Sequence, residues 1–241
     1  MVELKSSDVW GSYIACQSRC FEKARENEQQ KKPEPFITIS RQTGAGGITV
    51  GEKLAAYLRK HDQGALCPWT LFDRNLIATV LAEHHLPQNL ARSMPEGKIS
   101  EVQDMMEELF ELSPSVLTLV HKTSETILHL AQMGNAIVVG RGANVITRKF
   151  LPTGFHVRLI GSLEMRIRHI QDYYHLKRED AVQFVKKEDD GRKKYLKQNF
   201  DKDIDNPLLY DAIINTDFIS YDDVAQMIGG QVIRVVKNGK E

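Results

Sequence analysis

Residues 36–51, FITISRQTGAGGITVG, determine how the fold of this chain is interpreted. They open with an apolar run typical of a buried parallel strand, in which Phe36, Ile37 and Ile39 are the large side chains. The run breaks into a glycine-rich turn made of Gly44, Ala45, Gly46 and Gly47. Glycines leave the backbone free to point N–H groups at an anion, and a helical pattern at residues 49–58 would direct its positive dipole end at the same place. Strand, turn and helix together predict a phosphate-binding loop.

The spacing of the glycines can be compared with two known phosphate-binding sequence patterns. The dinucleotide fingerprint needs a third glycine where Thr49 stands, which disfavours a dinucleotide-binding fold. The pattern G-x-x-x-x-G-K-[ST] also fails as written, because Gly47 takes the place of the lysine and Ile48 that of the hydroxyl. If the following residue supplies the hydroxyl, Thr49 becomes the candidate neighbour of Mg²⁺, and Arg41 is the nearest cation able to reach a phosphate. A plain glycine turn between strand and helix stays open as the alternative.

Strand and helix patterns alternate beyond the loop, which predicts an α/β fold with a five-stranded parallel sheet covered on both faces. The further predicted strands are residues 65–72, 136–139, 155–160 and 213–214, and the predicted helices are 73–83, 115–133 and 222–235. Ser162 is the expected N-cap of another helix after the fourth strand. We expect residues 33–241 to form one domain, with a helical insertion at about 74–112, preceded by residues 1–32 as an N-terminal helix and linker.

Composition restricts the possible partners and the compartment. The chain has 241 residues with 32 basic and 32 acidic side chains, so it is formally neutral and offers no overall field for nucleic acid or a membrane. No apolar run approaches the ~20 residues that span a bilayer, and the N-terminus lacks the apolar core of a secretory signal. We therefore expect a cytoplasmic protein. Cys16, Cys20 and Cys67 are odd in number and contain no C-x-x-C pair, which predicts reduced thiols and neither a disulfide framework nor a zinc site.

Apolar side chains recur at helical spacing over residues 9–24 and predict one amphipathic helix. Its stripe contains Trp10, Tyr13 and Phe21. Each such side chain gains about 1.5–3 kcal/mol when buried, so the stripe must dock somewhere. Two dockings are open: packing on the helix's own domain, and a homodimer contact.

Six segments carry a resemblance to a known family. They are ITISRQTGAGG at 37–47, LFDRNLI at 71–77, VVGRGANVI at 138–146, FHVRLIGSLEMRIR at 155–168, DDGRKKY at 189–195 and LYDAIINTD at 209–217. In this order they resemble the cytidylate kinase-like family of P-loop nucleotide kinases over roughly residues 36–230. The resemblance implies a P-loop fold that uses ATP and Mg²⁺, and a basic lid at about residues 165–200.

The family's acceptor motifs are kept in part. In the family, the arginine and aspartate of a G-R-D motif contact the acceptor nucleotide; here Arg141 is kept and Gly142 stands in place of the aspartate, so recognition of cytosine or ribose is open. Asp189 and Arg192 match the D-x-x-R lid motif, in which the acid reads the acceptor base and the arginine the phosphate. Val185 occupies the position of that motif's upstream arginine. An ion pair of Arg141 with a neighbouring acid, and a solvated charged face around residues 186–194, are the structural alternatives.

Phosphoryl transfer needs cations and N–H groups arranged around phosphates, and these residues suit that task. We expect residues 44–48 to hold the donor phosphates, with Thr49 near Mg²⁺. The candidate catalytic cations are Arg41, Arg166 and Arg192, and the candidate acceptor-facing residues are Asp73, Arg141 and Asp189. The sequence thus predicts ATP-dependent transfer to a small phosphate acceptor, most like a nucleoside monophosphate such as cytidylate. The alternatives are a nucleotide sensor that has lost transfer, which the missing lysine favours, and a different small-molecule phosphotransferase.

Overall fold

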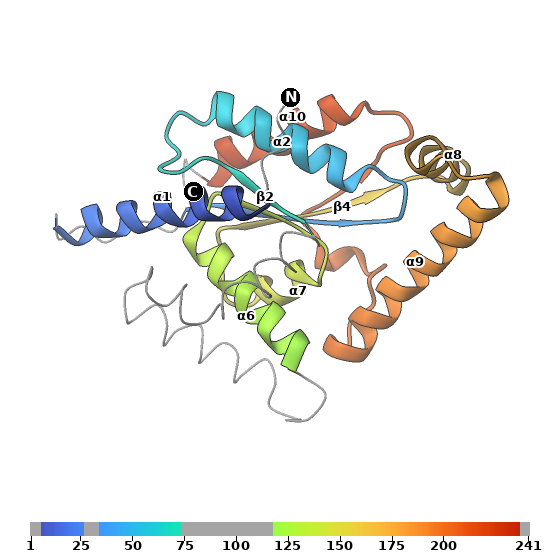
Figure 1. The fold of residues 1–241 in the computed structure, drawn as a ribbon, viewed down its shortest axis with the longest axis horizontal. Coiled ribbons are helices and arrows are strands. Elements are labelled where there is room, and N and C mark those ends of the chain that lie inside the picture. Colours follow the sequence, from blue (N-terminus) through green and yellow to red (C-terminus); the bar gives the residue numbers. More distant parts are fainter. Residues whose placement is uncertain (1–5, 27–33, 74–117, 237–241) are drawn as a thin grey trace.

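The computed structural model of the protein describes residues 6–26, 34–73 and 118–236 (Figure 1). Its elements in chain order are α1 (Ser6–Glu26), β1 (Phe36–Arg41), α2 (Gly47–His61), β2 (Thr70–Phe72), α6 (Thr118–Met133), β3 (Ala136–Val139), α7 (Ala143–Arg148), β4 (Gly154–Ile160), α8 (Leu163–Tyr174), α9 (Arg178–Phe200), the short 3-10 turn η1 (Pro207–Leu209), β5 (Ala212–Asn215), α10 (Tyr221–Gln231) and the π-helical turn η2 (Val232–Val236). None of the helices in this described part is long and apolar enough to cross a membrane. The predicted insertion at 74–112 lies outside the described residues, as does the predicted helix 73–83 apart from its first residue.

The five strands form one parallel sheet in the order β2-β3-β1-β4-β5, which confirms the predicted α/β fold. In the register of this sheet, Ile39 lies opposite both Val139 of β3 and Val157 of β4. The carboxyl ends of the strands therefore meet at one edge, where ligands of parallel sheets bind. The loop of residues 42–46, which joins β1 to α2, leaves the sheet at this edge.

Successive side chains of the central strands enter two separate cores because side chains alternate along a strand. Phe36 and Val138 belong to the core that contains residues of α1, α6 and α7. Ile37 and Val139 belong to the core on the other face, which contains residues of α2 and α10. Figure 1 shows α2 and α10 on one side of the sheet and α6 and α7 on the other. The result is a three-layer arrangement.

Several predicted element boundaries are wrong, most clearly at the second strand. The strand predicted at 65–72 is reduced to Thr70–Phe72. Just before it, the Trp69 indole Nε1 donates to a carboxylate oxygen of Asp62 at 2.8 Å, and Pro68 has no N–H to give to a ladder. Helix α7 (Ala143–Arg148) was not predicted, because its glycine-rich start reads as a turn.

Helix α1 docks on its own domain through its apolar stripe. Trp10 is 5% exposed and Tyr13 is 2% exposed. The Tyr13 ring meets Phe72 edge-on with centroids 5.1 Å apart, and its hydroxyl donates to the carbonyl oxygen of Gly134 at 2.7 Å. Burial removes these aromatic rings from water, which accounts for docking within the domain. A homodimer through this helix stays a prediction.

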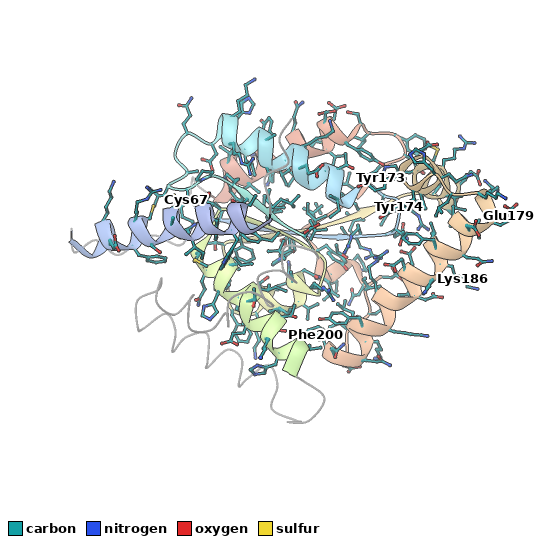
Figure 2. All side chains as sticks on the ribbon, in the orientation of Figure 1. Cys67, Tyr173, Tyr174, Glu179, Lys186 and Phe200 are labelled. Carbon is teal, nitrogen blue, oxygen red and sulfur yellow. A yellow bond between two sulfur atoms is a disulfide. The ribbon has the colours of Figure 1, made fainter. Side chains whose placement is uncertain are left out.

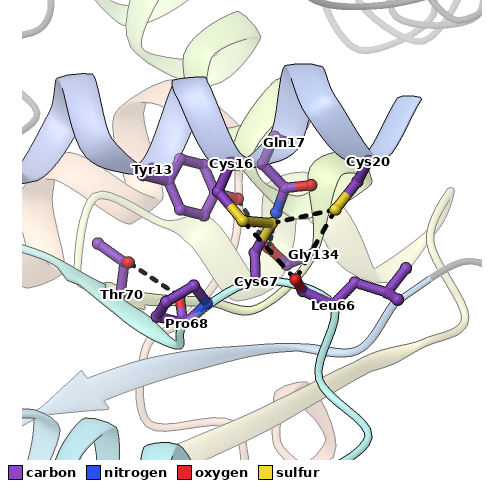
Figure 3. The surroundings of a disulfide bond; sticks show 9 residues. All are labelled: Tyr13, Cys16, Gln17, Cys20, Leu66, Cys67, Pro68, Thr70 and Gly134. Carbon is purple, nitrogen blue, oxygen red and sulfur yellow. Dashed lines mark hydrogen bonds between the residues drawn. A yellow bond between two sulfur atoms is a disulfide. The ribbon is translucent and has the colours of Figure 1, made fainter. Parts of the chain in front are cut away.

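The prediction of three reduced cysteines is wrong, since Cys16 forms a disulfide with Cys67 while Cys20 is free (Figure 3). The bonded residues are separated by 51 positions in the sequence, and their Cα atoms lie 5.9 Å apart. That distance is within the range that a disulfide spans. The docked helix α1 places its cysteines over the segment that leads into β2, a proximity that spacing along the chain does not reveal.

Candidate functional site

A cavity of about 750 Å³ opens at the carboxyl edge of the sheet. Of the residues singled out from the sequence, it is lined by Arg41, Gly44, Gly46, Gly47, Ile48, Thr49, Asp73, Arg141 and Arg192. Three of these, Arg41, Asp73 and Arg141, come at or directly after the ends of β1, β2 and β3. The other three singled-out residues, Ala45, Arg166 and Asp189, do not line it. The sheet edge thus brings together most of the predicted residues from four separate parts of the chain.

The loop between β1 and α2 requires two of its glycines. Gly44 and Gly46 have φ of +83° and +78°, a region that side-chain-bearing residues rarely adopt. A Cβ on Gly44 would lie 2.3 Å from the backbone oxygen of Arg166, and one on Gly46 would lie 2.5 Å from the ring of Tyr221. Ala45 between them is fully buried in the α2-side core. The loop is therefore anchored inward at Ala45, while Gly44 and Gly46 on either side line the cavity.

Arg41 lies across the loop in space that two glycines leave open. A Cβ on Gly47 would lie 2.8 Å from Cγ of Arg41, and one on Gly140 would lie 2.2 Å from its Nη1. Burial, followed by the neighbouring guanidinium of Arg192 and then that of Arg141, lowers the pKa of Arg41 to about 10. The carboxylates of Glu188 and Asp189 offset part of this effect, and Arg41 stays protonated at neutral pH because its pKa lies well above 7.

Arg141 adds a second guanidinium to the same cavity. Its φ is +57°, between Gly140 and Gly142, whose φ values are also positive. Its Nε atom is buried without a hydrogen-bond partner, and no ion pair of Arg141 occurs within residues 6–26, 34–73 and 118–236. A buried N–H without an acceptor costs free energy that a bound anion would recover. The alternative of a structural ion pair for Arg141 therefore receives no support from the described residues.

Asp189 of α9 is bonded to the glycine-rich loop between β1 and α2. The backbone N–H and hydroxyl of Thr43 donate to its Oδ1 at 2.8 and 2.7 Å. Burial alone would raise the pKa of Asp189, but the hydrogen bonds from Thr43 and the Arg166 guanidinium together hold it below its ordinary value. Arg192 donates to the Thr43 hydroxyl and also contacts Asp189, with 3.2 Å between Nη2 and Oδ1. This network ties α9 to the loop.

Arg166 lies behind the loop rather than in the cavity. Its side chain is buried, and Nη1 donates to the carbonyl oxygen of Thr43 at 3.0 Å and to Oδ2 of Asp189 at 2.7 Å. Nε donates to the carbonyl oxygen of Gly161 at 3.0 Å. Arg166 thus fixes the loop and the aspartate with respect to α8, a positioning role that its place after the fourth strand did not indicate.

The sequence reasoning missed a second contact that holds the loop. Nδ1 of His169 lies 2.8 Å from the carbonyl oxygen of Gly44 and 2.9 Å from the hydroxyl of Tyr221. His169 and Gly44 are 125 positions apart, and neither local motif nor periodicity gives a signal for such a pair. Tyr173 and Tyr174, at the C-terminal end of α8, also line the cavity beside α9 (Figure 2). Both tyrosines are more than a third exposed, so their rings are accessible to a planar ligand.

Val185, at the position of the family's upstream arginine, has a structural role here. It is fully buried together with Ile167, Ile170 and Ala181 in a small core between α8 and α9. An arginine there would place a charge inside this helical hairpin, which is costly without a partner. The packing of the hairpin accounts for the valine.

A parallel five-stranded sheet, whose first strand runs through a glycine turn into a helix, defines the class of P-loop α/β proteins. The chain belongs to the cytidylate kinase-like family, whose family model matches residues 36–218. Among solved structures, an uncharacterized protein from Eubacterium ventriosum is 17% identical with a TM-score of 0.56, and the match covers 84% of this chain and 100% of that one. At this identity the likeness concerns the fold alone.

Two shikimate kinases match with lower TM-scores. The enzyme from Bacteroides thetaiotaomicron is 14% identical with a TM-score of 0.39, and the match covers 83% of this chain and 99% of that one. The enzyme from Acinetobacter baumannii, in complex with shikimate, is 19% identical with a TM-score of 0.41, and the match covers 93% and 99%. No curated protein matches the chain.

Proposed function

We propose that the protein transfers a phosphoryl group from ATP to a small phosphate acceptor, most like a nucleoside monophosphate such as cytidylate. Membership of the cytidylate kinase-like family supports the reaction class. The observation that carries the proposal is the position of Arg41, which lies across Gly47 where the P-loop pattern has a lysine. The guanidinium groups of Arg41, Arg141 and Arg192 in one cavity, and the buried, unpartnered Nε of Arg141, support a site for an anion.

On the donor side, the residues in this cavity fit a Mg²⁺-bound polyphosphate. The turn at residues 44–48 would hold the phosphates through backbone N–H groups at the start of α2. Thr49 lines the cavity in the first turn of α2 and would hold Mg²⁺, which when bound offsets phosphate charge. Arg41 would stabilise the charge that develops between the donor phosphates, and because it already lies across the loop, little reorganisation is needed.

On the acceptor side, Arg141 would hold the acceptor's phosphate as a forked donor, and Asp73 faces the same cavity from the end of β2. The Tyr173 and Tyr174 rings would offer a surface on which a nucleobase can stack. Gly142 supplies no carboxylate at the family's aspartate position, and Asp189 is already bonded to Thr43 and Arg166 outside the cavity lining, so Asp73 is the carboxylate of the predicted set left to recognise the base or ribose.

The test is a transfer assay on the full chain with ATP, Mg²⁺ and a panel of acceptors, read by phosphorus NMR so that hydrolysis and transfer are distinguished. The panel contains the nucleoside monophosphates and small alcohols. Arg141→Ala should cost about 2 kcal/mol, or roughly 30-fold, in the kcat/KM for the acceptor, while ATP affinity is nearly unchanged. The matched control is Arg168→Ala, because Arg168 is an exposed arginine of α8 outside the cavity. Equal losses in both variants, or no ATP-dependent thermal shift in the wild type, would refute the proposal.

A nucleotide sensor is the second candidate, and one observation favours it. The carboxylate of Asp189 already accepts hydrogen bonds from the backbone N–H and hydroxyl of Thr43. A carboxylate of α9 that occupies hydrogen-bond donors of the loop would suit a protein in which nucleotide binding moves α9. Wild-type protein that binds ATP tightly but transfers phosphate to no acceptor and no water, and in which Asp189→Asn tightens ATP binding, would favour the sensor.

A further inference from the structure

Three cysteines lie close together where the N-terminal helix α1 contacts the segment before β2 (Figure 3). Cys16 and Cys20 lie one turn apart on α1, and Cys67 lies in the segment before β2. Cys16 and Cys67 are bonded, while Sγ of Cys20 lies 3.5 Å from Sγ of Cys67. The three sulfur atoms all lie within 4.8 Å of one another. A free thiol is therefore in contact with one sulfur of a disulfide.

The docking of α1 imposes this arrangement. Tyr13 and Gln17 precede the two α1 cysteines by three positions each, and they donate to the carbonyl oxygen of Gly134 at 2.7 and 3.2 Å. On the cysteine side, the carbonyl oxygen of Leu66 lies 3.7 Å from the sulfurs of both α1 cysteines. Because residues three and four apart share a helix face, these contacts hold both sulfurs over the same short segment.

Exposure separates the roles of the three sulfurs. Cys67 is 1% exposed, whereas Cys16 and Cys20 are only partly buried. A thiol or disulfide from solvent therefore reaches the α1 cysteines first. Cys67 is reached from Cys20, within the protein.

We propose that Cys16, Cys20 and Cys67 form a thiol–disulfide exchange site that low-molecular-weight disulfides oxidise. In the internal step, the Cys20 thiol loses its proton to solvent and its sulfur bonds to Cys67 Sγ. The Cys16–Cys67 bond breaks, and Cys16 leaves as a thiolate that takes up a proton, so no net electrons are exchanged. In the oxidation step, two protein thiols and one small disulfide give one protein disulfide and two small thiols.

The site joins α1 to the strand that leads into the cavity. Trp10 and Tyr13 of α1 contact the ring of Phe72, the last residue of β2, with centroids 6.4 and 5.1 Å away. Asp73 follows directly and lines the cavity. Either disulfide ties α1 covalently to the segment before this strand, whereas reduction leaves the helix held by its noncovalent contacts.

The experiment uses the full chain equilibrated in a glutathione redox buffer, quenched with acid, alkylated and digested with trypsin. Cleavage at Lys5, Arg19, Lys23, Lys60 and Arg74 places the three cysteines on separate peptides, residues 6–19, 20–23 and 61–74. Both linkages to Cys67 should occur in the wild type, within about tenfold of each other, because exchange between similar thiols has little net driving force. Cys16→Ser should form the 20–67 linkage in the same buffer, and Cys20→Ser the 16–67 linkage. Cys67→Ser is the control and should form neither.

Two results would overturn the proposal. In the first, Cys20 is always the alkylated thiol in the wild-type protein, and the Cys16→Ser variant never forms a disulfide between Cys20 and Cys67. The wild-type measurement does not depend on the folding of any variant. The other is reduced protein that retains one zinc ion per chain, with all three thiols protected from alkylation until a chelator is added. That outcome would assign a thiolate metal site instead.

Discussion

Replacing Arg41 with alanine should separate binding from transfer at the proposed phosphate site. Arg41 lies across the loop next to Gly47 and Gly140, and its pKa of about 10 reflects burial beside other guanidinium groups. Removing a preorganised contact of this kind costs about 2.7–4 kcal/mol of barrier stabilisation, or roughly 100- to 1,000-fold in rate. We expect transfer to fall by that factor while Mg²⁺-ATP still binds measurably.

A second substitution makes the test specific for charge at this position. In the wild type, a Cβ on Gly47 would lie 2.8 Å from Cγ and 3.2 Å from Cδ of Arg41, so Gly47→Lys should be overpacked by about 1–3 kcal/mol. In the Arg41→Ala background both of those atoms are gone and the nearest remaining atom, Cβ, lies 3.3 Å away. Gly47→Lys should therefore restore part of the activity only in that background. Gly47→Ala in both backgrounds controls for the added Cβ without adding charge.

The assay measures kcat and KM for ATP at saturating acceptor in all six proteins, together with their thermal midpoints. An enzyme indifferent to Arg41→Ala would show that the cation is supplied elsewhere, with Arg192 the next residue to change. Equal effects of Gly47→Lys with and without Arg41 would refute the steric argument. A wild type that binds ATP but transfers phosphate to no acceptor and no water would favour the sensor.

Three further predictions concern the fold. Gly142 has φ of +71°, and a Cβ there would lie 3.0 Å from an aromatic carbon, so Gly142→Ala should lower the free energy of unfolding in urea by about 1–2 kcal/mol. Gly11→Ala, at an open position of α1, should instead raise that free energy by about 0.5–1 kcal/mol. Equal effects of the two substitutions would contradict the strain argument. Burial lowers the pKa values of His129 and His156 from 6.5 to about 4. As the pH falls, these two histidines take up protons in the unfolded chain before they do so in the folded protein. The stability that the neutral histidines contribute should therefore be complete above pH 6.5 and fall by about 1.4 kcal/mol per pH unit for each histidine toward pH 4. A variant with glutamine at both positions should show a shallower pH dependence of its urea midpoint. Deleting residues 1–32 should lower the thermal midpoint, even under reducing conditions, because the deletion uncovers apolar surface. A truncated protein with an unchanged midpoint and half the sedimentation mass would instead assign the helix to a homodimer.

Much of the fold could be predicted because its determinants are local. Strand β3 begins and ends as the sequence predicts, and β4 extends the prediction by one residue, since each is a short apolar run bounded by turn residues. The parallel arrangement follows from strands that alternate with helices. Arg41, Asp73 and Arg141 could be assigned to one cavity because parallel strands end at the same edge of their sheet.

By itself, then, the sequence determined the α/β architecture, the glycine-rich turn and the residues that follow the strands, because these depend on periodicity and on the conformational freedom of neighbouring glycines. Only the tertiary structure decided what those residues contact. It placed Arg166 behind the loop, bonded Asp189 to Thr43, and brought Cys16 to Cys67. Each of these contacts joins segments far apart in the chain, and their proximity arises from helices α1, α8 and α9 packing against the sheet and the loop, which no local pattern encodes.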